Sequence, residues 1–244
     1  MNAHAPIRLL IYGASGRMGR ALLRLAAADA RFTVVAAVTR SGGDVDGTHA
    51  LAVEQVASAP DFDVLVDFSL PAAFDAALAL CVQRGCALVS GTTGLSDAQR
   101  TALDAAATSI PLVWSANFSL GVAVLNELVR RAAVALPGWD CGIVETHHTR
   151  KLDAPSGTAL SLGATIASVR GAQPPIVSLR EGDIVGEHTV QFTGIGERLE
   201  LVHRATDRDI FARGALQAAA CVHGKPPARY GLADLVFDDS SAER

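Results

Sequence analysis

The chain has 244 residues and a formal net charge of −4, and 50% of its residues are hydrophobic while only 5% are aromatic. This length can bury one large core or two small ones, and the apolar half with 19% charged residues excludes a disordered chain. No basic cluster suggests a nucleic-acid partner, and no apolar run reaches the ~20 residues of a membrane span or opens the chain as a signal peptide. We therefore expect a cytoplasmic enzyme with neither nucleic acid nor membrane as a partner.

The first half of the chain alternates short apolar runs with segments of helical composition. Strands are predicted at 7–12, 32–38, 64–68, 87–90 and 112–115, and helices at 17–28, 72–84 and 97–107. Strands that are apolar throughout and separated by helices are typical of a parallel sheet covered on both faces. The pattern predicts a Rossmann-like, doubly wound α/β domain.

The pattern changes after about residue 117. Helices are predicted at 122–134, 159–169 and 209–222, and extended segments at 141–146, 176–180, 184–192, 198–205 and 232–237. Polar and apolar residues alternate within 188–192, which indicates a sheet with one solvated face. We predict a smaller α+β domain with an open mixed sheet at 118–212, while 1–117 with 213–244 form the first domain.

A glycine-rich turn, GASGRMG, joins the first predicted strand to the first predicted helix. In dinucleotide-binding folds such a turn lets the backbone approach a pyrophosphate, whose charge sits against N–H groups at the helix start. The spacing is GxxGxxG rather than GxGxxG, so glycines needed only for the shape of the turn are the alternative. The strand before it and the helix after it favour a cofactor site at Gly13, Ala14, Ser15, Gly16, Arg17 and Met18.

The end of the second predicted strand bears on the choice of nucleotide. An acidic residue at this position holds the ribose 2′-hydroxyl of NADH in many dinucleotide-binding folds, but this chain has Thr39 and Arg40. An arginine can pair with a 2′-phosphate, which a carboxylate would repel. We predict NADPH rather than NADH, with a solvated surface charge as the alternative interpretation of Arg40.

Residues 145–158, ETHHTRKLDAPSGT, carry the densest chemistry. His147 can supply a proton near neutral pH, Lys151 can stabilise a developing negative charge, and the helix start at 155–158 offers N–H groups to a carboxylate. Together they suggest a small polyanionic substrate, although each alone could be structural. A metal at His147 and His148 lacks a third ligand, because Glu145 and His148 point to opposite faces of the predicted strand. The four cysteines lack the CxxC spacing of metal sites. We predict no metal and reduced thiols.

Several segments resemble the bacterial dihydrodipicolinate reductases, which belong to the diaminopimelate and lysine pathway. The resemblance covers nearly the whole chain, in order, at GASGRMGR, VDFS, GTTG, SANFSLGV, ETHHTRKLDAPSGTA, EGDIVGEHTV and GIGERLEL. The histidine pair followed by the lysine and DAPSGT is highly specific, whereas the glycine turn is not. The resemblance implies NAD(P)H-dependent reduction of 4-hydroxy-tetrahydrodipicolinate, a small dicarboxylate, to tetrahydrodipicolinate.

The resemblance also assigns roles to residues. It implies that His147 is the proton donor and Lys151 its partner, and that His148, Gly157 and Thr158 contact substrate. Further cofactor contacts are implied at Gly91, Thr92, Thr93, Ser115, Ala116, Asn117 and Phe118. The family has a nucleotide-binding domain that the C-terminal segment rejoins and a substrate-binding domain whose sheets associate in a homotetramer. Thr39 departs from members with an acid there, and the stretch between Arg40 and Asp63 is short.

Two other functions stay open at this point. A nicotinamide-dependent dehydrogenase of another small dicarboxylate would share the glycine turn but would not require the segment 145–158. A nucleotide-sensing protein without catalysis would have no need for His147 and Lys151 together.

Overall fold

A computed structural model of the chain describes residues 5–237. The chain forms two compact units: the described residues up to Phe118 join those from Phe211 onward in the first, and Ser119–Ile210 form the second. The outermost parts of the predicted first domain, residues 1–4 and 238–244, lie outside the described residues. Within the part that is described, no helix combines the length and apolar character that a membrane crossing requires.

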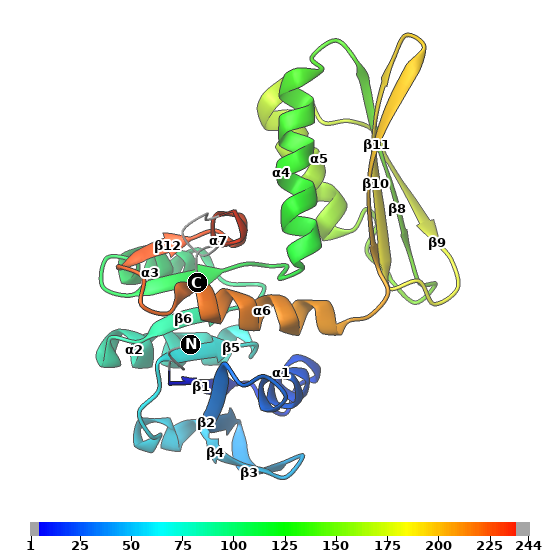
Figure 1. The fold of residues 1–244 in the computed structure, drawn as a ribbon. Helices are drawn as coiled ribbons and strands as arrows, with labels where there is room; N and C mark the ends of the chain where they lie inside the picture. The colour runs from blue at the N-terminus through cyan, green and yellow to red at the C-terminus, as the bar shows by residue number, and fades with distance from the viewer. Residues whose placement is uncertain (1–4, 238–244) are drawn as a thin grey trace. The chain divides into compact units, whose positions relative to one another are not determined.

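The first unit is built on an eight-stranded sheet with the order β12-β7-β6-β5-β1-β2-β4-β3 (Figure 1). Its strands are β1 (Ile7–Tyr12), β2 (Phe32–Thr39), β3 (Ser41–Val45), β4 (Thr48–Ala52), β5 (Val64–Asp67), β6 (Ala87–Ser90), β7 (Pro111–Trp114) and β12 (Ala228–Tyr230). Neighbouring strands pair in parallel except for the hairpin of β3 and β4. β5 and β6 are buried at every position, as strands covered on both faces should be. The predicted doubly wound sheet is confirmed.

Local sequence signals explain where the helices of this unit begin. They are α1 (Arg17–Ala27), α2 (Pro71–Arg84), α3 (Asp97–Ala106), α6 (Asp209–Val222), α7 (Leu232–Val236) and the 3-10 helix η1 (Val53–Ser58). Pro71 occupies the first turn of α2, where its missing N–H has no bond to lose. Ser96 caps α3 by accepting a hydrogen bond from Gln99 N, and Ser96 N in turn donates to the Gln99 side-chain oxygen. Both helices were predicted within two residues.

The structure contradicts the predicted strand at 232–237. Residues Leu232–Val236 form helix α7, and the edge strand of the sheet is instead the preceding β12. The Asp234 carboxylate accepts a hydrogen bond from Gly231 N at the helix start, and Leu232 and Leu235 are both buried. A short apolar run fits a strand or one helical turn equally well, so the cap and the three-residue spacing decide. The hairpin of β3 and β4 was not predicted, because it has few apolar residues and three glycines and an aspartate at positive φ.

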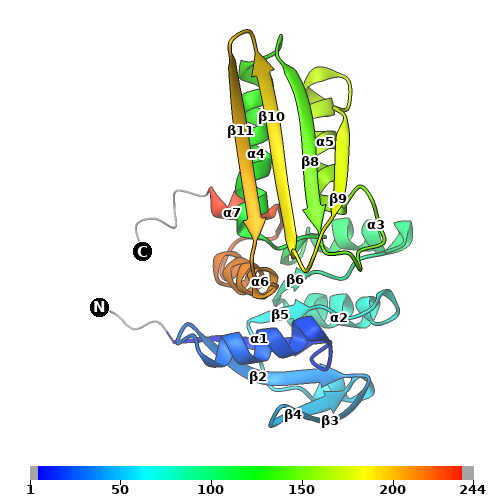
Figure 2. The ribbon, with the colours of Figure 1, turned by 90° about the vertical axis from the view of Figure 1, so that its right-hand side faces the viewer.

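The second unit is a four-stranded open sheet packed against two helices (Figure 2). The elements are α4 (Leu120–Ala135), β8 (Asp140–His147), α5 (Gly157–Arg170), β9 (Ile176–Arg180), β10 (Gly186–Gly194) and β11 (Glu197–Ala205). The order is β11-β10-β8-β9, with β8 and β9 parallel and the other pairs antiparallel, which confirms the mixed sheet. Its core joins Leu125 and Val129 of α4 and Leu162 of α5 to Val190 and Phe192 of β10.

Candidate active site

The glycine turn lies tightly against the loop that follows β5. Gly13 has φ +83, and a Cβ there would lie 2.6 Å from the Phe68 carbonyl oxygen. A Cβ on Gly19 would lie 2.4 Å from the Gly13 carbonyl oxygen, so the first turn of α1 can approach the turn only without a side chain. Gly16 is different, because its Cβ would meet only the Gly13 oxygen, at 3.3 Å. Close packing against backbone therefore explains the glycines at positions 13 and 19, whereas a Cβ at position 16 would make only one tight contact.

Helix α1 begins at this turn without a side-chain cap. Its N-cap residue is Gly16, and Arg20 N donates the first intrahelical bond to the Gly16 carbonyl. Ser15, Gly16 and Arg17 are exposed, so the start of the helix is open to a ligand. Uncapped N–H groups with the positive end of the helix dipole favour an anion such as a pyrophosphate.

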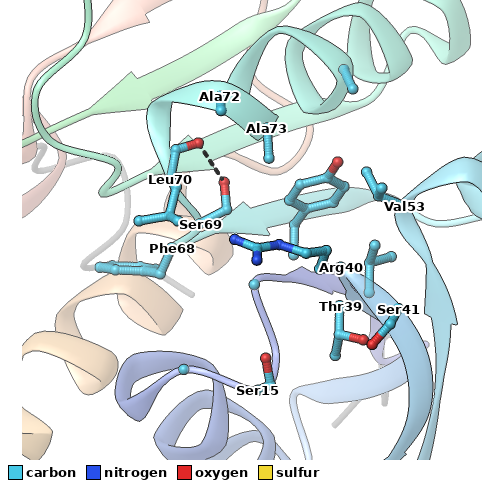
Figure 3. Close-up of a pocket in the computed structure, with 15 residues that line it drawn as sticks. Ser15, Thr39, Arg40, Ser41, Val53, Phe68, Ser69, Leu70, Ala72 and Ala73 are labelled. Atoms are coloured by element: carbon cyan, nitrogen blue, oxygen red, sulfur yellow. Dashed lines mark hydrogen bonds between the residues drawn. The ribbon is translucent and has the colours of Figure 1, made fainter.

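A pocket of about 730 Å³ opens beside the turn (Figure 3). It lies at the carboxyl ends of β1 and β2 and the loop after β5, where the strand order of the sheet reverses and where α/β folds bind nucleotides. Its lining residues are Tyr12, Gly13, Ser15, Gly16, Val38, Thr39, Arg40, Ser41, Val53, Phe68, Ser69, Leu70, Ala72, Ala73 and Ala76. None of these is acidic. The shape and chemistry fit a dinucleotide.

Arg40 and Thr39 have different surroundings in this pocket. The Arg40 side chain extends toward Phe68 and Ser69 (Figure 3), and the residue is exposed. The Thr39 hydroxyl donates to the Gly42 carbonyl oxygen at 3.1 Å, so it supports the turn into β3. Arg40 is therefore the cation available to a ligand at the end of β2.

The predicted cofactor contacts Ala14, Arg17 and Met18 and the segments 91–93 and 115–118 lie outside this lining. A buried carboxylate holds the loops after β5 and β6. Asp67, fully buried, accepts hydrogen bonds from the hydroxyls of Ser90 at 2.7 Å and Thr92 at 2.8 Å and from Ser69 N at 3.0 Å. A Cβ on Gly91 would lie 2.2 Å from the Phe68 ring, which ties the segment 91–93 to the pocket wall. In the segment 115–118, the rings of Phe118 and Phe68 lie 5.5 Å apart.

In the second unit, a buried carboxylate organises the predicted catalytic segment. Glu145 and His147 lie two residues apart on the same face of β8, and Glu145 Oε2 is hydrogen-bonded to His147 Nδ1. Glu145 Oε1 accepts from Arg180 Nη2 at 3.0 Å and from Ser156 N at 3.3 Å. Arg180 is opposite His147 on the parallel neighbour β9. The carboxylate therefore joins two strands and the start of α5.

The charge states of this cluster follow from these contacts. Burial alone would raise the pKa of the Glu145 carboxyl, but hydrogen bonds from Ser178, Arg180 and His147 outweigh it and hold that pKa below its ordinary value. Burial lowers the pKa of His147, with further lowering by Lys151 and Arg180, although Glu145 acts in the opposite direction. His147 is therefore mostly neutral at pH 7 and donates its Nδ1 proton to Glu145.

The loop from β8 to α5 brings the other predicted substrate residues near His147. Lys151 Nζ lies 2.8 Å from both oxygens of Asp153, and Lys151 N donates to the His148 carbonyl. Helix α5 begins at Gly157 after the N-cap Ser156, whose hydroxyl accepts from Ala159 N at 3.2 Å. Gly157 is exposed and Thr158 half-buried, so the helix start is open to a ligand.

His148 contacts Arg208, a cation that the sequence patterns did not predict near the site. Its Nε2 lies 3.0 Å from Arg208 Nη2, so Nε2 accepts and the ring proton is on Nδ1. Arg180 and Arg208 were not among the predicted site residues, and Glu145 and Ser156 lie in the predicted segment 145–158 without an individual role. Period-two alternation on β8 could have paired Glu145 with His147. No local pattern gives the strand pairing that places Arg180 or the path of the loop after β11 that places Arg208.

Three side chains of this cluster have the spacing of metal ligands. Ligand atoms of Glu145, His147 and His188 lie within 4.8 Å of one another. However, each Glu145 oxygen already has a hydrogen-bond donor, and Arg180 places a fixed positive charge beside the carboxylate. A cation would have to displace the His147 proton next to that guanidinium, so the contacts favour a hydrogen-bonded pair.

The sheet, the glycine turn and the pocket define a Rossmann-type nucleotide-binding protein with a second unit carrying acid–base groups. The comparisons identify the family. Residues 7–118 match the family model "Dihydrodipicolinate reductase, N-terminus", and residues 121–236 match its C-terminus counterpart. The chain belongs to the dihydrodipicolinate reductase family. It is thus an oxidoreductase that uses a nicotinamide nucleotide.

Similar proteins agree over nearly the whole length. The 4-hydroxy-tetrahydrodipicolinate reductase of Stenotrophomonas maltophilia (strain R551-3) is 65% identical over 95% of this chain and 98% of its own. That of Xanthomonas campestris pv. campestris (strain B100) is 63% identical over 96% and 99%. A dipicolinate-bound dihydrodipicolinate reductase from Paenisporosarcina sp. TG-14 has the same fold, with a TM-score of 0.83 at 24% identity over 94% of this chain and 99% of that one.

Proposed function

We propose that the protein reduces 4-hydroxy-tetrahydrodipicolinate to tetrahydrodipicolinate in lysine and diaminopimelate biosynthesis. In the balanced reaction, substrate, reduced nicotinamide nucleotide and one proton give tetrahydrodipicolinate, oxidised nucleotide and water. The nucleotide supplies the hydride when bound. The observation that supports this function best is the pairing of buried Glu145 with His147, next to Lys151 and the open start of α5.

His147 is the proton donor in this proposal. Loss of the 4-hydroxyl as water turns the substrate into a conjugated cyclic imine, and hydride addition to that imine leaves electron density that must be protonated. The Glu145 carboxylate stabilises the imidazolium form of His147, so the ring can take up a proton and deliver it from Nε2 while Nδ1 stays bonded to Glu145. Arg180 and Ser156 N hold the carboxylate in place and keep it ionised.

The substrate's two carboxylates require positive groups in the second unit. The start of α5, where Gly157 is exposed and Thr158 half-buried, offers backbone N–H groups, and Lys151 adds an ammonium that a substrate carboxylate can share with Asp153. His148 accepts a hydrogen bond from Arg208 at Nε2 and so orients this cation beside the substrate site. A small dicarboxylate therefore fits the site better than a monoacid.

The pocket of the first unit suits NADPH better than NADH. Arg40, beside Ser41, is the cation among the residues lining the pocket, and no lining residue is acidic. A 2′-phosphate can pair with Arg40, whereas NADH finds no carboxylate there for its 2′-hydroxyl. Gly13 to Met18 hold the pyrophosphate, and the segments 91–93 and 115–118 contact the nicotinamide end. The first unit is thus the dinucleotide-binding domain.

The second unit is the substrate-binding domain and also supports a homotetramer. The helices α4 and α5 cover one face of its sheet (Figures 1 and 2), and the described part of this unit contributes no helix to the other face. Exposed apolar side chains occur on that other face at Val177, Leu179 and Val202. Uncovered apolar residues on a sheet favour sheet-to-sheet association with further copies. The four free thiols are consistent with assembly in the reducing cytoplasm.

The test is a coupled assay. Pyruvate and aspartate semialdehyde are condensed by an appropriate synthase, and nucleotide oxidation is followed by absorbance with NADPH and with NADH. Oxidation that depends on the condensation product supports the proposal. Turnover with other dicarboxylates but not with this product would identify a different dehydrogenase. Nucleotide binding without any turnover would identify a sensing protein.

A further inference from the structure

The two helices of the second unit begin in the same way, with a serine N-cap whose hydroxyl also lies beside a histidine of the sheet. Ser119 caps α4 by accepting from Val122 N, and Ser156 caps α5 by accepting from Ala159 N, both at 3.2 Å. Each cap hydroxyl also meets a histidine of the sheet. Ser156 Oγ lies 3.1 Å from His188 Nε2, and Ser119 Oγ lies 3.4 Å from the Nε2 of His203, the residue paired with His188 across β10 and β11.

The two histidines differ in what else they contact. The His188 ring lies edge-on to the His147 ring, with centroids 5.2 Å apart, and its partner Ser156 also donates its backbone N–H to Glu145. His203 lies under α4, where Gly121 leaves room for its ring. Only the Ser156–His188 pair at the start of α5 therefore connects the proposed proton donor to the proposed carboxylate site.

The His188 ring has one hydrogen-bond partner among the described residues, the Ser156 hydroxyl. The residue is 4% exposed, its Nδ1 has no partner among the described residues, and burial lowers its pKa to about 4, so it stays neutral. Leaving a buried polar atom unpaired is unfavourable. An apolar residue would fill this place in the core without that cost, so packing alone does not explain a histidine here.

We propose that His188 is a positioning residue: through Ser156 it fixes the start of α5, so that the Gly157 and Thr158 groups face a substrate carboxylate, and its ring edge orients His147. This inference rests on the proposed function. It assigns His188 no contact with the substrate and no proton transfer. Its effect should therefore be greatest on dicarboxylate binding and absent from nucleotide binding.

The experiment compares His188→Leu with His188→Gln, whose side-chain amide can replace Nε2. Binding of dipicolinate is measured by calorimetry, together with KM, kcat and nucleotide affinity. We expect His188→Leu to weaken dipicolinate binding and raise the substrate KM about tenfold or more, to leave nucleotide affinity unchanged, and His188→Gln to recover most of the loss. The matched control is His203→Leu, which should leave dipicolinate affinity unchanged.

The outcomes separate the inference from the proposed function. Wild-type protein that neither binds dipicolinate nor turns over the substrate contradicts the proposed function. Wild-type binding with an unchanged dissociation constant in His188→Leu overturns the inference alone, as does an equal loss in His203→Leu or in His188→Gln. If His188→Leu does not fold, Ser156→Ala against Ser119→Ala decides, because only the former should weaken dipicolinate binding.

Discussion

Arg180 Nη2 lies 3.0 Å from Glu145 Oε1, and the other oxygen of this fully buried carboxylate is bonded to His147. The carboxylate thus stands between a permanent cation and a titratable ring. Arg180 keeps it ionised, and it in turn opposes the effect of burial on the imidazole. The proposed acid depends on this arrangement, because without Glu145, burial would lower the pKa of the imidazole still further and make its protonated form rarer at neutral pH.

Glu145→Gln should move the pH dependence of kcat/KM. A general acid must be protonated, so activity falls as pH rises through the pKa of His147, which already lies below its ordinary value. Removing the Glu145 charge lowers that pKa further and moves the alkaline limb to lower pH, with about a tenfold loss at pH 7 per pKa unit. Glu127→Gln is the control, since Glu127 pairs with Arg130 and Arg131 on α4. A limb that stays in place or moves to higher pH would contradict this coupling.

His147→Gln and Lys151→Ala should each lower kcat by about 10²-fold or more, as for loss of a proton donor or a charge stabiliser. Lys151→Ala should also weaken dipicolinate binding, because it removes an ammonium that a carboxylate can use. Steady-state kinetics and calorimetry measure the two effects. Near-normal turnover in either variant would remove that residue from its proposed role.

Arg40→Ala should weaken the binding of NADPH more than the binding of NADH. The lost pairing with a 2′-phosphate should lower kcat/KM about 10- to 100-fold with NADPH and only a few-fold with NADH. Arg8→Ala serves as the control, since Arg8 pairs with Asp63 at the amino end of β1, away from the pocket. Equal effects on both nucleotides would refute the 2′-phosphate assignment.

Alanine variants of two glycines of the turn should affect different properties: one should change nucleotide binding and the other the stability of the fold. Gly16→Ala meets one atom at 3.3 Å and has φ −72, so it should change the free energy of unfolding little while raising the nucleotide KM about tenfold. Gly19→Ala places a Cβ 2.4 Å from backbone and should destabilise the fold by about 1–3 kcal/mol or more. Denaturant titrations and nucleotide titrations measure the two variants. An unchanged nucleotide KM in Gly16→Ala would speak against a pyrophosphate at this turn.

Val202→Asp should dissociate the proposed homotetramer. The side chain is 39% exposed on the uncovered sheet face, and a buried carboxylate at an interface lacks a partner. Light scattering after size exclusion gives the mass. Leu160→Asp, at a residue of α5 that is 45% exposed, is the matched control and should keep the wild-type mass. A wild-type monomer, or a Val202→Asp tetramer, would show that this face is not the interface.

The net charge of −4 shows why composition alone could not describe the binding sites, since both proposed ligands are anions. The positive groups are local: Arg40 lines the pocket of the first unit, where we propose that the nucleotide binds, and Lys151, Arg180 and Arg208 lie near the histidines of the second unit. A global charge balance argues against nucleic acid, but the placement of a few cations decides which small anions can bind.

Local signals in the sequence determined the order and type of the main elements, the glycine turn and the reactive segment 145–158, because periodicity, caps and glycine spacing act over a few residues. The short run at 232–237 was predicted wrongly for the same reason, since one helical turn and a strand have the same local pattern. Only the tertiary structure decided that Arg180 reaches Glu145 across β8 and β9 and that His188 meets Ser156 from β10. Such contacts depend on strand register, which is fixed when the whole core packs.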